Sequence, residues 1–377
     1  MQLSQEDSLR INVLLNQSLQ AVRIDEGKMM VYGLTERGEA TIKLNPNCKD
    51  ETYVRRIKEV ISSHVLGSPG GYPVFLKRWT RMGQARSESL ESLLKLGEPE
   101  AVIAVVGAKG ITDEIARRAW WAMPNADNAR RMLAGADIVS GEMGKILAEF
   151  LIEFLPFEEE PRNMIESVRL VLQPELISDK AVADLWKKGG RKNAYLVGFL
   201  ISRPHNLPQT ATPHTLFAEH QATLKQLATD NSIADMLLTL LDTAGQAYLA
   251  TIQQVLKKPA NQDVVVALFD TIDHYLRPVR PHGEKRRDIE QIVIEAKQFC
   301  EIEQSCQYQQ ALTELKQACP SLLPLIESVF VLSCAGEQLV APIFAKTDAV
   351  GSVMRRKLEP ILTPLNQHIA RLLGQTN

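Results

Sequence analysis

The residues best suited to specific chemistry follow a glycine-rich loop near residue 70. The loop, Gly67-Ser68-Pro69-Gly70-Gly71, cannot form regular structure and exposes backbone N–H groups. Aromatic rings and positive charges follow it directly. Binding of a phosphate backbone with stacked bases requires this combination. We therefore predict a basic and aromatic binding surface whose residues in this segment are Tyr72, Lys77, Arg78, Trp79, Arg81 and Arg86.

The same pattern also fits a packed helix. In that interpretation Phe75 and Trp79 are buried, and the neighbouring cations extend their charged ends into solvent. Both interpretations stay open at the level of the sequence.

Further candidates lie downstream, where a basic doublet precedes two tryptophans. Trp120 and Trp121 are consecutive in a predicted helix, so only one of them can point straight into a core. The other belongs at a boundary or at a partner surface, where tryptophan is favoured. A second basic doublet, Arg130-Arg131, would complete a groove for an anionic polymer if it faced the same way. We add to the predicted surface Arg117, Arg118 and Trp121.

Few patterns point to catalysis. Glu149 and Glu153 are one helical turn apart and could poise a general acid beside a general base. Asp270 and His274 have the same spacing and could supply two metal ligands if a second helix provided more. We interpret both pairs as parts of solvated helix faces. The spacings of a nucleophile elbow, a phosphate loop and a dinucleotide-binding loop are missing, so we expect no catalytic residues, no metal and no cofactor.

The composition is that of a folded protein without a global electrostatic field. Hydrophobic residues make up 45% of the 377 residues, charged residues make up 23%, and the formal net charge is −2. Only a local basic surface could therefore attract nucleic acid. No apolar run approaches the roughly 20 residues of a transmembrane helix, and the first residues lack a basic signal region. We expect no membrane contact and a cytoplasmic protein with reduced cysteines at Cys48, Cys300, Cys306, Cys319 and Cys334.

A small α+β module is expected at the N-terminus. Helical periodicity covers residues 4–17 and 50–64, and runs with a period of two predict three short strands between them, at 21–24, 28–32 and 40–44. Turns that contain Gly27 and Gly38 separate the strands. A three-stranded sheet needs one covered face, which the two helices can supply. We place this module at residues 1–85.

The rest of the chain is predicted to be helical. Hairpins that turn near residues 98, 125 and 158 resemble stacked HEAT-like helix pairs and define a segment at 86–202. A linker rich in Pro and Thr is expected at 203–215, followed by a helical bundle at 216–377.

Two long apolar stripes support the bundle. One runs without interruption from Ile233 to Val255, and the other runs from Val350 to Leu372. The predicted fold class is therefore mainly α, with an N-terminal α+β module that contains a three-stranded antiparallel sheet, stacked helical hairpins and a C-terminal helical bundle.

Two runs of the sequence are distinctive: residues 64–84 (HVLGSPGGYPVFLKRWTRMGQ) and residues 120–124 (WWAMP). With residues 31–35 (VYGLT) and 198–200 (GFL) before Arg203-Pro204, they resemble the DsrS family. These soluble proteins accompany the dissimilatory sulfite reductase cluster of sulfur-oxidising bacteria. The similarity runs over most of the chain. It implies a cytoplasmic accessory protein that regulates or supports sulfur oxidation, and it brings no catalytic residues.

These observations predict a non-catalytic accessory or regulatory protein. We expect it to bind a protein partner, or RNA or DNA, along the helical hairpins and the basic surface. The alternative is an enzyme whose active site lies between the N-terminal module and the hairpins, with Lys77, Glu149 and Glu153 as candidates. A deep pocket joining these residues would favour the enzyme, whereas a flat, open groove would favour binding.

Overall fold

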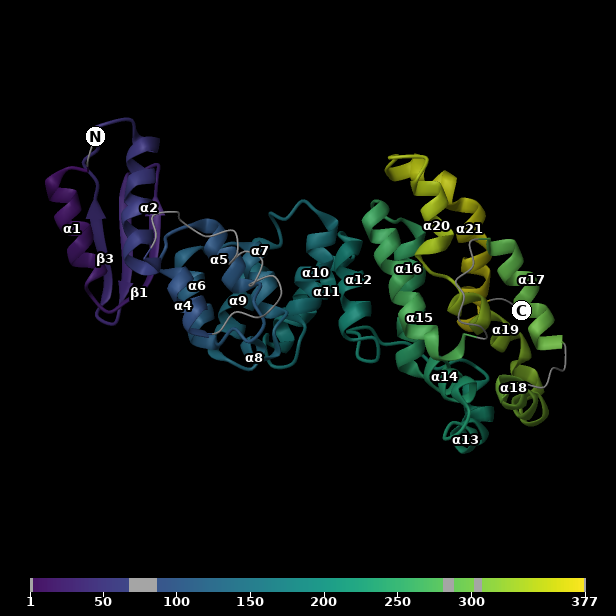
Figure 1. The fold of residues 1–377 in the computed structure, drawn as a ribbon. Helices are drawn as coiled ribbons and strands as arrows, with labels where there is room; N and C mark the ends of the chain where they lie inside the picture. Colours follow the sequence, from purple (N-terminus) through teal and green to yellow (C-terminus); the bar gives the residue numbers. More distant parts are fainter. Residues whose placement is uncertain (1–2, 68–86, 281–287, 302–306, 376–377) are drawn as a thin grey trace. The chain divides into compact units, whose positions relative to one another are not determined.

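The computed structural model of the chain describes residues 3–67, 87–280, 288–301 and 307–375. Their contacts form two compact units, the first made of Met1–Pro156 with Gln173–Ile177 and the second of Phe157–Leu172 with Ser178–Asn377. The chain is 69% helical and carries one sheet near its N-terminus (Figure 1). The predicted fold class is confirmed. The predicted division into four segments stays a prediction.

The N-terminal sheet is an antiparallel meander in the order β1-β2-β3. Its strands are β1 (Leu19–Asp25), β2 (Met30–Thr35) and β3 (Gly38–Lys43). The helices that flank it in the chain are α1 (Gln5–Leu15) and α2 (Asp50–Leu66). In the register, Arg23 is paired with Tyr32, and Tyr32 with Thr41. These three residues therefore share one face of the sheet.

The other face is packed against α1 and α2, as predicted. Sheet residues and helix residues form one buried cluster, which includes Ile11, Leu14, Val22, Val31, Tyr53 and Ile57. A polar contact fixes the helices to each other: the Asp7 carboxylate accepts hydrogen bonds from the Tyr53 hydroxyl at 2.5 Å and from the backbone N–H of Asn45 at 2.7 Å. Because Asp7 and Tyr53 are fully buried, this contact locks α1 to α2 and to the segment after β3.

The turn between β1 and β2 differs from the prediction. Gly38 has the expected positive φ, 115°, but in the first turn the left-handed residue is Met29, with φ 51°, and not Gly27. The Asp25 carboxylate accepts a hydrogen bond from the backbone N–H of Lys28 at 2.9 Å. This side-chain contact closes a longer turn, so β2 begins at Met30 and not at Lys28.

The first unit continues with short helices: α4 (Ser87–Leu94), α5 (Pro99–Val106), α6 (Asp113–Ala122), α7 (Ala126–Leu133), α8 (Ala136–Val139) and α9 (Glu142–Phe154). The predicted hairpin turns near residues 98 and 125 are both present. Gly97, with φ 69°, ends the first helix of one hairpin, and Pro99 begins the second. Asn125 begins α7, because its side chain accepts a hydrogen bond from the N–H of Asn128 at 2.9 Å.

The second unit is a bundle whose helices are α10 (Pro161–Val171), α11 (Asp179–Gly189), α12 (Asn193–Ser202), α13 (Phe217–Leu227), α14 (Ser232–Leu241), α15 (Thr243–Lys257), α16 (Gln262–Leu276), α17 (Ile289–Glu301), α18 (Gln307–Ala318), α19 (Leu323–Ser333), α20 (Glu337–Phe344) and α21 (Gly351–Leu372). Two 3-10 turns, η1 (Arg277–Val279) and η2 (Pro320–Leu322), lie between them. Helix α12 packs against α10, α11, α15 and α16, and α19 packs against α16, α17 and α21. These two helices form the centre of the unit.

The stripe that was predicted to run continuously from Ile233 to Val255 belongs to two helices. Helix α14 ends at Leu241, and the Asp242 side chain accepts a hydrogen bond from the N–H of Thr243 at 2.7 Å to begin α15. An aspartate at this position caps a new helix and so interrupts an otherwise uniform apolar pattern.

Of the stripe predicted from Val350 to Leu372, the part from Ile361 to Leu372 is buried as predicted, and only its start differs. Met354, Leu358, Ile361 and Leu365 are buried, whereas Val353 is exposed. Steps of four, three and four residues connect the buried positions, and this helical phase turns Val353 away from the bundle.

No single helix among the described residues is both long and apolar enough to cross a membrane. The pair Gln310–Ala318 and Pro320–Ser333 reaches the required length and composition together, but its two parts meet at 114°. Ile326, Val329 and Phe330 of this pair are buried in the second unit.

His368 joins α21 to α19 and makes the stability of the bundle depend on pH. Its Nδ1 lies 3.1 Å from the hydroxyl oxygen of Ser328, and its side chain is buried. Burial, with a smaller contribution from the charge of Arg371, lowers the pKa of His368 to about 4. Between about pH 6.5 and about pH 4, His368 binds a proton in the unfolded chain but not in the folded chain. Stability therefore falls as the pH drops through this window.

We expect His368 to lower the free energy of unfolding by about 2 kcal/mol at pH 5 relative to neutral pH. The variant His368→Gln cannot titrate and should lose this part of the pH dependence. Urea unfolding followed by circular dichroism at both pH values measures the effect. His274→Gln, at an exposed histidine, is the control and should keep the dependence. An equal pH dependence in wild type and His368→Gln would contradict the assignment.

Candidate interaction site on helix α6

The predicted site residues divide into two groups. Tyr72, Lys77, Arg78, Trp79, Arg81 and Arg86 lie outside the described residues. Arg117, Arg118 and Trp121 are described, and all three lie on α6. The described part of the site therefore consists of α6 and the residues that contact it.

Helix α6 is held firmly at its N-terminus. The Thr112 hydroxyl accepts a hydrogen bond from the N–H of Ile115 at 3.3 Å, and Asp113 and Glu114 place negative charge in the first turn. The Asp113 carboxylate also accepts a hydrogen bond from the N–H of Met143 at 3.0 Å, at the start of α9. The side chains that follow on α6 thus project from a fixed helix.

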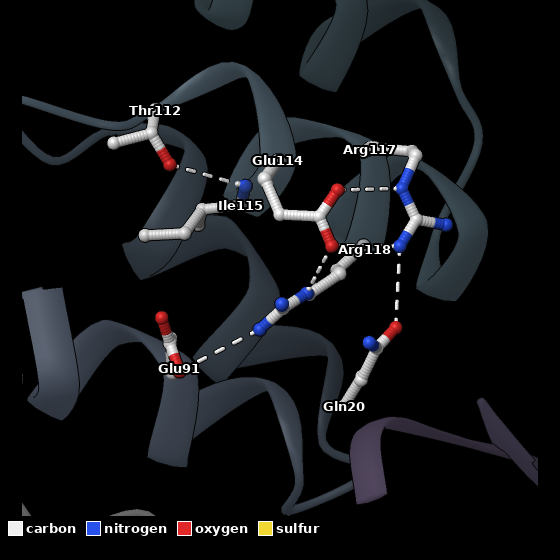
Figure 2. Close-up of polar contacts among 7 residues, drawn as sticks. All are labelled: Gln20, Glu91, Thr112, Glu114, Ile115, Arg117 and Arg118. Carbon is white, nitrogen blue, oxygen red and sulfur yellow. Dashed lines mark hydrogen bonds and ion pairs between the residues drawn. The ribbon is translucent and has the colours of Figure 1, made fainter. Parts of the chain in front are cut away.

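Glu114 binds both arginines of the predicted surface (Figure 2). Its carboxylate accepts hydrogen bonds at 2.8 Å from Nε and Nη2 of Arg117 and from Nε of Arg118. The hydrogen bond from Arg117 is the largest cause of the shift that lowers the pKa of Glu114 to about 2. The same contact raises the pKa of Arg117. Glu114 and Arg117 are therefore charged at neutral pH, and Glu114 offsets part of the positive charge.

The arginines also connect α6 to its neighbours. Nη2 of Arg117 donates a hydrogen bond to Oε1 of Gln20 on β1 at 3.2 Å, and Nη1 of Arg118 lies 3.5 Å from the Glu91 carboxylate on α4. Figure 2 shows Arg117 reaching Gln20 and Arg118 reaching Glu91. The two consecutive arginines thus extend in different directions: β1 restrains Arg117, and α4 restrains Arg118.

Trp121 extends the site over the sheet. Its indole N–H donates a hydrogen bond to the Glu39 carboxylate at 2.9 Å. The guanidinium of Arg23 lies 5.2 Å from the centre of the Trp121 ring and 4.5 Å from that of Tyr32, which is cation–π geometry. Trp120 packs edge-on against Phe150 at 4.8 Å. Both tryptophans are half-buried, so neither is a core residue and each covers a different neighbour.

We name the set Gln20, Arg23, Glu39, Glu91, Glu114, Arg117, Arg118 and Trp121 the α6 face. Its positive and negative side chains are equal in number, so this described part of the predicted surface has mixed charge. The predicted basic surface as a whole stays a prediction, because its other residues lie outside the described ranges. The Arg130-Arg131 doublet does not add a second pair of cations, because Arg130 is buried and forms an ion pair with Asp127. Buried Arg130 therefore does not offer an exposed cation to the groove that the two doublets would line.

An open pocket of about 480 Å³ adjoins the α6 face. It lies within the first unit, between the N-terminal module and the hairpins, and Glu91 and Arg118 are in its wall. The other charged or titratable lining residues are Glu36, His64 and Lys95. Glu149 and Glu153, the carboxylate pair considered for acid–base chemistry, are exposed on α9 and do not line it.

Two buried thiols, Cys300 and Cys319, are not activated. Burial raises the pKa of Cys300 to about 12 and also raises that of Cys319. Both thiols therefore keep their protons at neutral pH and are poor nucleophiles. Within the described ranges, no group of three or more His, Cys, Asp or Glu side chains could hold a metal ion.

Part of the α6 face could have been recognised from the sequence. Glu114 precedes Arg117 and Arg118 by three and four residues, the spacing of ion pairs within a helix. The contacts of Trp121 with Glu39 and of Arg117 with Gln20 span 82 and 97 residues, and no local pattern indicates them.

Comparisons with protein-family models, with curated proteins and with solved structures give no match. The fold defines the chain as a mainly α protein with an N-terminal α+β module.

Proposed function

We propose that this chain is a non-catalytic accessory or regulatory protein of cytoplasmic sulfur oxidation, related to DsrS, that acts by binding a protein partner through the α6 face. The sulfur-oxidation context rests on the resemblance of residues 64–84 and 120–124 to that family. The binding role rests on the geometry of the first unit.

The observation that supports binding most strongly is the arrangement of Arg117 and its neighbours. Three elements, β1, α4 and α6, contribute charged or amide side chains that are hydrogen-bonded or ion-paired to one another yet still partly exposed. Side chains held in one geometry lose little entropy when a partner docks. A tryptophan at the edge of such a face is also a favoured interface residue.

The balance of charge favours a protein partner over RNA. Affinity for a nucleic-acid backbone depends on cations that neutralise phosphates. On the α6 face, Glu114, Glu91 and Glu39 already neutralise Arg117, Arg118 and Arg23. A partner with complementary charges of both signs fits this pattern better, because mixed charge supports orientation and specificity.

The pocket beside the α6 face supports a second candidate function, an enzyme with its active site between the N-terminal module and the hairpins. His64, Glu36 and Glu91 bring imidazole and carboxylate groups to one pocket, as acid–base chemistry requires. Arg118 and Glu91 are paired with each other on its wall, which leaves fewer groups to act on a substrate.

A charge reversal on the α6 face tests the binding role. Proteins retained by the immobilised wild-type chain from an extract of a sulfur-oxidising bacterium would be quantified by mass spectrometry and compared with those retained by Arg117→Glu. We expect the amount of retained partner to fall at least tenfold. The new carboxylate would lie beside Glu114 and would repel the partner's acidic group that Arg117 binds. A labelled RNA of mixed sequence, titrated at two salt concentrations, tests the nucleic-acid alternative.

Arg169→Glu is a closely matched control. Arg169 also pairs with a glutamate three residues earlier, Glu166, at 2.8 Å from Nε, and its side chain is 36% exposed compared with 46% for Arg117. It should retain the partner fully. Equal retention by Arg117→Glu and wild type would contradict the proposal. RNA binding that falls steeply with salt would make RNA the partner, and captured proteins unrelated to sulfur oxidation would remove the pathway assignment.

A further inference from the structure

The start of α21, in the second unit, presents apolar and cationic side chains together to solvent. Val350 directly precedes the helix and is 67% exposed, and Val353 is 54% exposed. Arg356 and Lys357 are also exposed and follow Val353 by three and four residues. These spacings place them on the same side of the helix as Val353, turned away from the buried Met354. We name Val350, Val353, Arg356 and Lys357 the basic start of α21.

The cations of this surface are not neutralised within the described chain. Nζ of Lys357 donates a hydrogen bond to the Thr347 hydroxyl at 2.7 Å, which is an uncharged contact. Arg356 forms no hydrogen bond or ion pair with another described residue. The nearby acids Asp348 and Glu359 are exposed and do not pair with either cation. The surface therefore keeps positive charge beside exposed valines, and an acidic partner with an apolar residue would match it.

Helix α9 of the first unit has a row of this kind on its exposed side. Four exposed residues follow one another at steps of four, three and four, so they lie along one side of the helix: Glu142, Ile146, Glu149 and Glu153. Ile146 is 47% exposed. No hydrogen bond or ion pair from the described residues engages the three carboxylates, and the neighbouring cation Lys145 offsets only one of the three charges. We name this row the acidic stripe of α9.

The two surfaces match in spacing as well as in charge. Glu149 follows Ile146 by three residues, and Arg356 follows Val353 by three residues. Because each residue advances a helix by about 1.5 Å, two helices side by side in the same direction, with Ile146 against Val353, place Glu149 level with Arg356. The next glutamate of the stripe then lies within about one turn of the second cation.

We propose that the acidic stripe of α9 in one copy of this chain docks on the basic start of α21 in a second copy. Each copy carries both surfaces, so one contact satisfies the charges of the two. An anionic lipid surface would attract the cations of α21 but would leave the acidic stripe unmatched. No residue of the α6 face takes part, so this contact is separate from the proposed binding role.

Self-association of the full chain tests the proposal. One helix side against another buries less than the roughly 1,000 Å² of a stable interface, so we expect a weak contact with a Kd of about 100 µM at low salt. Sedimentation equilibrium between about 5 and 300 µM protein covers this range. The average mass should rise with concentration, and raising the salt from about 50 to 500 mM should weaken the association at least tenfold, because exposed charges are screened.

Two double charge reversals locate the contact. Glu149→Lys with Glu153→Lys makes both surfaces basic, and Arg356→Glu with Lys357→Glu makes both acidic. Each variant alone should self-associate at least tenfold more weakly than wild type, because like charges meet. An equal mixture of the two should associate about as strongly as wild type, since every contact between them again joins opposite charges.

Glu100→Lys and Lys257→Glu reverse exposed charges on other helices and should leave the self-association unchanged. Circular dichroism checks that every variant is folded. The proposal fails if wild type stays monomeric over the whole range, if either double variant associates as wild type does, or if the mixture of folded variants stays monomeric. Monomeric wild type that sediments with phosphatidylserine vesicles would assign the basic start of α21 to a lipid surface instead.

Discussion

Replacing Asp273 with alanine is expected to lower the free energy of unfolding by about 3–5 kcal/mol. The carboxylate is on α16 and pairs with Arg280, just after η1, and with Arg277 at 3.3 Å. The side chains of Asp273 and Arg280 are 3% and 6% exposed. Without the carboxylate, the guanidinium of Arg280 stays in the interior, where its Nε donates to the Ser333 carbonyl at 2.7 Å, and its charge has lost its partner. A buried charge left in this way is strongly destabilising.

Arg277→Ala is the control for this prediction. The Arg277 side chain is 59% exposed, so its ion pair with the same carboxylate is screened by solvent and contributes less than about 1 kcal/mol. Urea unfolding of the two variants and of wild type, followed by circular dichroism, measures the difference. If Asp273→Ala and Arg277→Ala lower the free energy of unfolding by similar amounts, burial of the Asp273–Arg280 pair does not explain the cost of losing the carboxylate.

The second large effect is expected for Gly245→Ala, which should lower the free energy of unfolding by about 3 kcal/mol. A Cβ atom at this position would lie 2.2 Å from the carbonyl oxygen of Thr239 and 2.3 Å from Cα of Leu240. These are backbone atoms of α14 and cannot move aside as a flexible side chain does. Helices α14 and α15 would have to separate.

Gly190→Ala is the matched glycine substitution. A Cβ atom added at Gly190 would have the carbonyl oxygen of Lys187 as its nearest neighbour, at 3.4 Å. The φ of Gly190, −61°, suits any residue. We expect the free energy of unfolding to change by less than about 0.5 kcal/mol, because alanine fits this conformation and makes the unfolded chain less flexible. Thermal unfolding at one protein concentration compares the variants. If Gly245→Ala unfolds at the wild-type temperature, the helices are not in the close contact described.

The local elements of this fold are readable in the sequence because short-range physics dictates them. Alternation in 21–24 and 40–44 produced strands, and Gly97 with Pro99 produced a helix end and a helix start at the expected place. The errors have local causes as well. Side chains that bond their own backbone, Asp25 in the first turn and Asp242 between α14 and α15, interrupt patterns that apolar periodicity alone would continue.

The mainly α character, the N-terminal sheet and the aromatic and basic residues of α6 can all be read from the sequence. The contacts that those residues make depend on the packing of distant elements. The sequence already places Glu114 at ion-pair spacing from Arg117 and Arg118, but only folding brings Gln20 to Arg117, Glu91 to Arg118 and Glu39 to Trp121. Periodicity specifies which side of an element is apolar, whereas the partner of a charged side chain depends on which distant elements pack together. The pocket of about 310 Å³ whose lining includes Leu200 and Tyr275 arises in the same way, because α12, α15 and α16 must meet before it exists.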